Sequence, residues 1–473
     1  MIQPGLERIG RLLQNVQFPW KAIHVAGTNG KGSICGYAST LLTRGLISNG
    51  RFTSPHIVNR WDCITINNQA VSEQEFRRVE NHFIKLNEQE NINASEFELL
   101  TATAFQLFTE QKIDVGIIEV GMGGRLDSTN ILENQIVSVI SKIAHDHQGF
   151  LGNTIEEIAL HKAGILRPNV PFIVNPLNQW NVHEVIENYA KEIGAGPRIL
   201  LDTVELQREL FSTKDWHQFA ESKLPFQRDN ALLAYLAYLE VLKSLGLGTR
   251  NATQLLVDVK NTQPLPGRLQ KVLCPVVFGR EDRREILVDG AHNPDAAQAL
   301  LAYVNQKFNV SPPTRLEAAI RHPITWVLAM TQGKDAREYL KILLRPGDSV
   351  VTTSFGPIDG MPWVKSMGSE ELLKVAKEVV PGITGLAVSK RGVYRALCAA
   401  KYLATSTHIV LTGSLYLVGD FFREHEIASE ALREAAKEES RAGAEGNIDH
   451  IYNIGQIDQE EKRRVTAFLA QNA

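Results

Sequence analysis

The stretch that decides the fold is residues 23–33, Ile23-His-Val-Ala-Gly-Thr-Asn-Gly-Lys-Gly-Ser33. It begins as a short apolar run, passes through glycines, and leads into a segment where Ile34, Tyr37 and Leu41 recur at helical spacing. A strand, a glycine-rich loop and a helix in this order are the setting in which proteins bind phosphate groups. The sequence therefore predicts an α/β domain built around a phosphate-binding loop.

The residue types in this loop suit the binding of a triphosphate. Glycines let backbone N–H groups turn toward phosphate oxygens, Lys31 supplies a positive charge, and the Ser33 hydroxyl can help to position Mg²⁺. The match to GxxxxGK[ST] is imperfect, because Val25 replaces the first glycine and Gly32 follows the lysine. An ordinary glycine turn is the alternative. The predicted nucleotide contacts are Gly27, Thr28, Asn29, Gly30, Lys31, Gly32 and Ser33.

A second glycine-rich element begins where another apolar run ends, in Ile113-Asp-Val-Gly-Ile-Ile-Glu119-Val-Gly-Met-Gly-Gly124. A carboxylate at a strand end beside a phosphate loop is placed to bind the magnesium ion of a nucleotide. Glu119 is therefore the candidate metal ligand, and a surface acid at a strand end is the alternative.

Strand-like and helix-like segments alternate along the rest of the chain, which is typical of parallel sheets. The fold class is therefore α/β, with two such units. The apolar runs are 22–26, 115–120, 136–143 and 171–174, then 285–289, 324–330, 348–354 and 408–412.

Two prolines and a glycine at 261–268 follow a helical region from 229 to 260 and cannot continue a helix. We place the domain border there. We expect an N-terminal domain over 1–264 and a smaller α/β domain over 265–473. From about residue 424 the chain is rich in charged residues, which is read as a solvated terminal helix or frayed tail.

The composition is that of an ordinary folded protein. The 473 residues are 44% hydrophobic, and 50 Lys plus Arg against 53 Asp plus Glu give a net charge of −3, which offers no bulk attraction for nucleic acid or an anionic membrane. The four cysteines are far apart, which argues against a disulfide framework or a thiolate zinc site. No apolar run approaches the roughly 18 residues of a membrane span. We expect a cytoplasmic monomer, with a mitochondrial pool left open.

The order of the motifs resembles that of folylpolyglutamate synthases and dihydrofolate synthases, a branch of the Mur-type ligases, from about residue 5 to 420. The motifs are GTNGKGS at 27–33, TSPH at 53–56, FELLT at 97–101, EVGMGGRLDSTN at 119–130, DH at 146–147 with LG at 151–152, KAG at 162–164, PGR at 266–268, DGAHNP at 289–294 and GSLY at 413–416. The resemblance implies a P-loop ATPase domain joined to a second α/β domain. It also implies an amide-forming ligase, in which ATP phosphorylates a carboxylate and the amine of glutamate attacks the acyl phosphate.

The resemblance further implies roles for residues near the phosphates. Lys31 would hold the β- and γ-phosphates, Ser54 and Glu119 the first Mg²⁺, and His147 a second Mg²⁺. The family lysine at the position of Lys162 is carbamylated, which turns a cation into a carboxylate able to serve the second metal site. Without the resemblance, Lys162 would be read as a helix residue that reaches solvent, and His147 as an ordinary core or surface histidine.

Other nucleotide contacts are implied in both domains. Asp289 and His292 would contact the nucleotide, Arg268 would reach its phosphates, and Asn230 would lie near the base. ATP would then close the two domains over the reacting groups and exclude water. The DGAHNP segment is also the pattern of a strand-to-helix turn, with Asn293 as N-cap and a proline at the first helical position, and the two roles are compatible.

The run at 123–127, Gly-Gly-Arg-Leu-Asp, resembles the dihydropteroate-using enzymes of the family, whereas many strict polyglutamate synthases lack an arginine at the position of Arg125. Asp127 is placed to accept hydrogen bonds from a pterin, and Phe97 to offer it an aromatic surface. A charge at a helix N-terminus and a core phenylalanine are the plain alternatives. Residues 61–63, Trp-Asp-Cys, stand where polyglutamate synthases often have Arg-Glu-Arg.

The predicted reaction joins L-glutamate to 7,8-dihydropteroate with ATP and two Mg²⁺ ions, giving dihydrofolate, ADP and phosphate. The stretch DHQGFLG at 146–152 resembles fungal dihydrofolate synthases and favours it. The alternatives are a folylpolyglutamate synthase or bifunctional enzyme, a paralogue that joins an amino acid to another carboxylic acid, and a P-loop switch. A switch needs no second metal site, so His147 and Lys162 argue against it.

Overall fold

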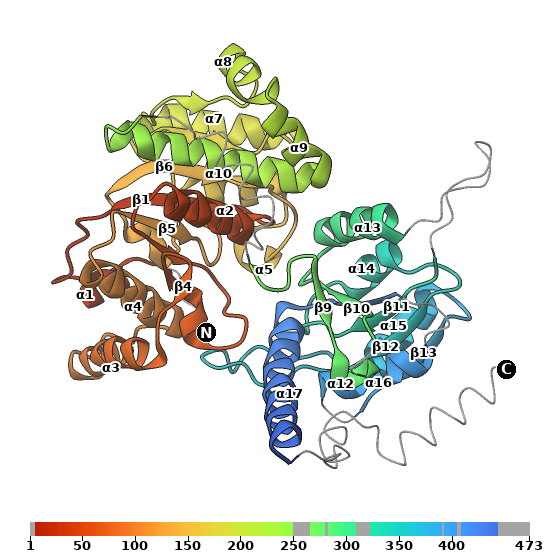
Figure 1. Ribbon diagram of the computed structural model, residues 1–473. Coiled ribbons are helices and arrows are strands. Elements are labelled where there is room, and N and C mark those ends of the chain that lie inside the picture. Colours follow the sequence, from red (N-terminus) through yellow and green to blue (C-terminus); the bar gives the residue numbers. More distant parts are fainter. Residues whose placement is uncertain are drawn as a thin grey trace. The chain divides into compact units, whose positions relative to one another are not determined.

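The computed structural model describes residues 5–248, 265–279, 282–308, 322–389, 392–403 and 408–442 (Figure 1). The chain forms two compact units, Met1–Leu265 and Pro266–Ala473. The predicted border at residue 264 ends the segment 249–264, which lies outside the described residues, as does the charged tail beyond residue 442.

The first unit is built on an eight-stranded sheet in the order β4-β3-β2-β5-β1-β6-β7-β8. Its central strands are parallel and almost wholly buried, and runs of Val and Ile without alternation are what a sheet covered on both faces requires. The strands are β1 (Lys21–Ala26), β2 (Asn49–Phe52), β3 (Ile64–Ile66), β4 (Gln69–Ala70), β5 (Val115–Glu119), β6 (Gln135–Ile140), β7 (Phe172–Val174) and β8 (Arg198–Ile199).

Two sets of helices cover this sheet (Figure 1). On one face α2 (Lys31–Arg44) and α10 (Pro225–Ser244) pack against alternate residues of the central strands, such as Ile23 and Val25. Their neighbours Ala22 and Ala26 face helices on the other side. That side carries α1 (Glu7–Leu12), α3 (Glu73–Gln89), α4 (Glu96–Glu110), α6 (Ile155–Ala163) and α7 (Trp180–Ile193). Shorter helices are η1 (Arg60–Cys63), η2 (Ser128–Ile131), α5 (Gln148–Leu151), α8 (Val204–Leu206), η3 (Gln207–Phe211) and α9 (Lys214–Ser222).

The second unit carries a six-stranded sheet in the order β13-β12-β11-β14-β10-β9, parallel except for β9. The predicted apolar runs correspond to β10, β11, β12 and β14, and the α/β class is confirmed. The strands are β9 (Gln270–Leu273), β10 (Glu285–Val288), β11 (Thr325–Leu328), β12 (Ser349–Thr352), β13 (Thr384–Ala387) and β14 (Ile409–Thr412). The helices are α12 (Pro275–Phe278), α13 (Pro294–Phe308), α14 (Ala336–Leu343), α15 (Ser369–Val379), α16 (Val393–Leu403) and α17 (Leu415–Ala442). Among the described helices of both units, none is long and apolar enough to cross a membrane.

Buried polar side chains in the first unit are linked by hydrogen bonds from the central sheet to the loop after β5. His24 on β1 is fully buried, with Nδ1 3.0 Å from Gln135 Nε2 and Nε2 2.9 Å from Thr129 Oγ1. Because the Gln135 amide donates to Nδ1, the neutral ring donates from Nε2 to Thr129, whose hydroxyl donates to Asp127. Burial, assisted by Arg167, lowers the pKa of His24 to about 3.

This histidine should make the fold sensitive to mild acid. Between its folded pKa of about 3 and its unfolded value of 6.5, the unfolded chain binds a proton that the folded chain does not. The free energy of unfolding should therefore fall as the pH drops below 6.5, by about 2 kcal/mol at pH 5. Urea unfolding at pH 7 and pH 5, for the wild type and His24→Gln, measures this contribution. Equal losses in both proteins would contradict it.

Candidate active site

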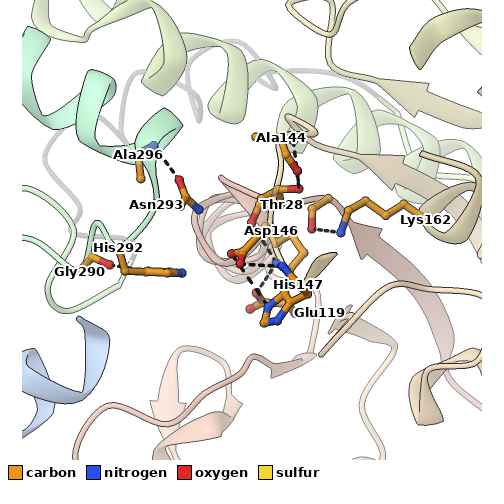
Figure 2. Close-up of polar contacts among 12 residues, drawn as sticks. Thr28, Glu119, Ala144, Asp146, His147, Lys162, Gly290, His292, Asn293 and Ala296 are labelled. Atoms are coloured by element: carbon orange, nitrogen blue, oxygen red, sulfur yellow. Dashed lines mark hydrogen bonds and ion pairs between the residues drawn. The ribbon is translucent and has the colours of Figure 1, made fainter. Parts of the chain in front are cut away.

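The predicted phosphate loop connects β1 to α2 and is held from behind by the chain after β6. Thr28 N and Asn29 N donate to Lys142 O at 2.8 and 3.1 Å. The Thr28 hydroxyl donates to Ala144 O at 3.0 Å and accepts from Ala144 N at 3.1 Å (Figure 2). Helix α2 follows Gly30 without a side-chain cap, so its first N–H groups and its dipole are directed at the loop. This arrangement favours the binding of an anion at the loop.

Two glycines of the loop are required by their neighbours. Gly27 has φ 146°, and a Cβ there would lie 1.7 Å from Ser141 Oγ. Gly30 has φ 93°, and its Cβ would lie 2.5 Å from Asn230 Oδ1 on α10. Asn230, predicted near the nucleotide base, therefore lies directly against the loop.

Residues predicted from three separate motifs meet beside the loop. Lys31 Nζ donates to Thr28 O at 3.2 Å and lies 3.7 Å from Glu119 Oε1. Glu119 Oε2 accepts a hydrogen bond from Ser54 N at 3.3 Å. Glu119 is buried, so its charge is poorly screened and acts strongly on Lys31. A cation, a carboxylate and a serine thus share one corner of the loop.

Lys162 on α6 reaches the same loop. Its residue is 4% exposed, and Nζ donates to Gly27 O at 2.8 Å (Figure 2). Burial, together with repulsion from Lys31, lowers the pKa of Lys162 to about 7, against the attraction of Asp146 and Asp127. The ammonium of Lys162 is therefore easily deprotonated.

Asp146 is a neighbour of this lysine that the sequence did not single out. Its carboxylate Oδ1 accepts from His147 N at 2.8 Å, and His147 Nε2 lies 4.0 Å from Oδ2. His147 has a left-handed backbone (φ 54°) and a side chain that is 47% exposed. The pair of acid and histidine in the 146–147 motif was the available signal. Asp146 adds a carboxylate to the side of the loop where a second metal is predicted.

Within the described ranges, no three His, Cys, Asp or Glu side chains are grouped so as to hold a metal ion by themselves. The predicted ligands instead combine a carboxylate with a serine. These are hard oxygen donors, and Mg²⁺ prefers such donors while keeping several waters. A carboxylate and a serine hydroxyl, as in Glu119 and Ser54, are therefore the kinds of donor that a magnesium ion bound to a nucleotide phosphate would take.

The predicted pterin contacts lie on the loop after β5 and on α4. Asp127 caps helix η2: Oδ1 accepts from Thr129 N at 3.0 Å and from its hydroxyl, and Oδ2 accepts from Met122 N at 2.8 Å. Burial raises the pKa of Asp127, although these hydrogen bonds oppose the shift. The plain role as a helix N-terminal charge is confirmed. A pterin would have to share this carboxylate with the loop.

Phe97 and Arg125 differ in exposure. Phe97 in the first turn of α4 is half-buried, stacked on Phe52 with centroids 6.0 Å apart, and so close to Gly121 that a Cβ there would lie 2.4 Å from the ring. Arg125 is exposed, and its N donates to His161 O at 2.8 Å. Phe97 is thus fixed in place.

The second unit arranges its predicted residues at the end of β10. Asp289 is buried, with Oδ2 accepting from Leu269 N and Oδ1 from Ala291 N, both at 2.8 Å. Burial raises the pKa of Asp289, and Arg268 opposes this. His292 Nδ1 donates to Gly290 O at 2.9 Å (Figure 2).

The predicted cap of the next helix is confirmed. Asn293 Oδ1 accepts from Ala296 N at 2.9 Å, and α13 starts at Pro294 (Figure 2). The cap fixes the direction in which the DGAHNP segment leaves the sheet.

Comparisons with known proteins place the chain beside one family of enzymes. A family model described as dihydrofolate synthetase, C-terminal domain, matches residues 279–424. A probable dihydrofolate synthetase of Schizosaccharomyces pombe is 39% identical over 431 residues, covering 89% of this chain and 98% of that protein. Dihydrofolate synthetase of Saccharomyces cerevisiae is 33% identical over 440 residues, covering 90% and 98%.

A solved structure shows the same fold. A bifunctional folylpolyglutamate synthase/dihydrofolate synthase with Mn, AMPPNP and L-glutamate bound has a TM-score of 0.69 at 25% identity, covering 90% of this chain and 95% of that one. The resemblance drawn from the order of the motifs is thereby confirmed. The chain belongs to the family of dihydrofolate and folylpolyglutamate synthases, a group of ligases.

Proposed function

We propose that this protein is a dihydrofolate synthase, which joins L-glutamate to 7,8-dihydropteroate and converts ATP to ADP and phosphate. The observation that carries the proposal is the corner formed by Lys31, Glu119 and Ser54 at the N-terminus of α2. Two fungal dihydrofolate synthetases related over nearly their whole length support the choice of acid.

The loop would bind and orient the triphosphate. The pteroate carboxylate attacks the γ-phosphorus and ADP leaves, then the glutamate amine attacks the acyl carbon and phosphate leaves. Lys31 would stabilise the negative charge on the transferring phosphoryl group, and its place in a half-buried corner makes that charge effective. Asn230 beside the loop, and Arg268, Asp289 and His292 in the second unit, are the proposed further nucleotide contacts.

Glu119 and Ser54 would hold one Mg²⁺. The ion, when bound, offsets the repulsion between the carboxylate and the triphosphate. The related structure with Mn and AMPPNP bound supports a divalent ion here. The second ion remains our proposal, with His147 and the carbamate of Lys162 as its ligands and Asp146 as a neighbouring carboxylate.

Carbamylation of Lys162 is supported by the state of its amine. A pKa of about 7 leaves much of the side chain neutral at pH 7, and only a neutral amine adds to CO₂ to give a carbamate and a proton. The half-buried Phe97 and the loop that carries Asp127 and Arg125 are the proposed pterin-binding surface. The monomeric state and the cytoplasmic location stay predictions from the sequence.

The reaction class and substrate are tested by one assay. Sustained release of ADP and phosphate should require Mg²⁺, glutamate and a folate-type acid together, because the acyl phosphate formed from the acid must react with the amine before the next turnover. Dihydropteroate should be used far better than tetrahydrofolate. Formation of AMP and pyrophosphate would contradict the acyl-phosphate route. Equal or better use of tetrahydrofolate would favour the bifunctional or polyglutamate alternative. The related solved structure is named as such a bifunctional folylpolyglutamate synthase/dihydrofolate synthase.

A further inference from the structure

The chain between β2 and β3 forms a closed loop, residues 53–63, that carries Ser54. Its base is tied by Thr53 N, which donates to Cys63 O at 2.9 Å, and by the antiparallel pairing of Phe52 with Ile64. The ends of the loop are therefore fixed by the sheet. Its middle needs other contacts to hold one conformation.

Inside the loop, one carboxylate of the short helix η1 organises the backbone that precedes this helix. Asp62 accepts hydrogen bonds from three consecutive amides, Ile57 N at 3.1 Å, Val58 N at 2.7 Å and Asn59 N at 2.9 Å. Hydrogen bonds to an ionised acceptor are stronger than those between neutral groups. The loop is thus stiffened internally by Asp62.

Outside the loop, Arg60 ties it to two helices. The residue is only 6% exposed, with Nη2 2.6 Å from Glu80 on α3 and Nη1 2.8 Å from Glu96 at the start of α4. Glu80 also pairs with Arg77 at 2.9 Å. Arg77 in turn lies over the ring of Trp61, 5.6 Å from its centroid. A buried guanidinium shared by two carboxylates holds its partners in one geometry.

The two segments that Arg60 joins both carry residues of the candidate site. Ser54, at the start of the loop, donates from its N to Glu119. Glu96 directly precedes Phe97, whose ring stacks on Phe52 at an interplanar angle of 22°. The Arg60 side chain therefore connects the loop that carries Ser54 to the first turn of α4, which carries Phe97.

We propose that Arg60 is a positioning residue, which fixes the 53–63 loop and the first turn of α4 so that Ser54 and Phe97 are set at the same time. This proposal rests on the proposed function for the identity of the substrates. The anchor itself is a property of the first unit and can be measured without turnover. A residue that only stabilised the fold would not alter one substrate's KM selectively.

The test compares Arg60→Met, Arg60→Lys and Glu96→Gln, with Arg78→Met as matched control. Arg78 lies on α3, is 58% exposed, and pairs with Glu110 away from the loop. Arg60→Met should raise both the KM for dihydropteroate and the Mg²⁺ concentration for half-maximal rate about tenfold, because misplacement by a fraction of an ångström is costly in catalysis. The KM for ATP should change less than about twofold, since the phosphate loop is untouched.

The other variants separate the two ends of the anchor. Glu96 is 47% exposed, so Glu96→Gln should fold normally, raise the KM for dihydropteroate and leave the Mg²⁺ dependence unchanged. Arg60→Lys keeps the charge and should show smaller increases in the KM for dihydropteroate and in the Mg²⁺ requirement than Arg60→Met. Arg78→Met should match the wild type. If Arg60→Met does not fold, the combined variant Arg60→Met, Glu80→Gln, Glu96→Gln removes the unpaired charges and should show the same kinetic pattern.

Hydrogen exchange of the amides of residues 57–59 supplies the measurement without turnover. These amides should exchange faster in Arg60→Met than in the wild type or Arg78→Met. Unchanged exchange rates, or equal increases in the KM for ATP and the KM for dihydropteroate, would overturn the positioning role. A wild type that does not use dihydropteroate would instead defeat the proposed function, and the exchange result would still decide whether Arg60 anchors the loop.

Discussion

Lys31→Met should lower kcat by about 10²–10³, which corresponds to about 3–4 kcal/mol of transition-state stabilisation. The side chain lies 3.7 Å from Glu119 Oε1 at the N-terminus of α2, which is where the proposed mechanism places the transferred phosphoryl group. Methionine keeps most of the length of the side chain and removes the ammonium. Steady-state ADP release with dihydropteroate and glutamate measures the loss.

Lys142→Met is the matched control for this variant. Lys142 follows β6 beside the same loop, but its Nζ donates to Leu177 O, and only its backbone carbonyl holds the loop. Its replacement should leave kcat within about twofold of the wild type. Similar losses in both variants would mean that general positive charge near the loop, rather than the place of Lys31, matters. A near-normal rate for Lys31→Met would remove the loop from the mechanism.

Lys162→Ala should fold and lose about 10²–10³ of kcat if the lysine acts as a carbamate, since a preorganised charged group is then absent. Folding should be retained because burial already disfavours the ammonium, as its pKa of about 7 shows, so little favourable charge interaction is lost. Small carboxylic acids in the buffer should restore part of the rate by taking the place of the carbamate. Lys191→Ala, an exposed position on α7, is the control.

The modification has its own readout. Protein equilibrated with ¹³C-bicarbonate should give a carbamate resonance that is missing in Lys162→Ala. Unfolding of the alanine variant would favour a structural role through the bond from Nζ to Gly27 O. A folded variant with wild-type kcat would contradict the carbamate.

The central strands could be predicted from the sequence because they are buried on both faces. β1, β5 and β6 are buried along nearly their whole length and consist mainly of apolar residues, a pattern that can be recognised without knowing which strands pair. The run at 136–143 was predicted too long. β6 ends at Ile140, because Ser141 and Lys142 turn to hold the phosphate loop.

Strands at or next to the sheet edges were not predicted. β4, at one edge of the first sheet, consists of two exposed residues. β3 beside it and β9 at an edge of the second sheet are short antiparallel strands whose pairing depends on neighbours rather than on their own pattern. Strand preference at an edge is weak for this reason.

The candidate site was predictable where the sheet brings motifs together. Val25 lies opposite Glu119 in the register of β1 and β5, so the loop and the acid must meet at the carboxyl ends of neighbouring parallel strands. The contacts of Arg60 could not be foreseen, because Glu80 and Glu96 come from two separate helices. The role of Asp127 at a helix N-terminus was one of the two roles that the pattern offered, and the structure shows it as the cap of η2.

The contact between Gly30 and Asn230 bears on how the protein is made. The loop is synthesised early, but the side chain that packs on it belongs to α10, far later in the chain, and α10 and α2 share one core. A contact of such long range closes only after the intervening strands β2 to β8 have left the ribosome. The nascent chain therefore carries the nucleotide motif long before it has a nucleotide site. Binding of ATP, which requires that site, can stabilise the first unit only once α10 has docked.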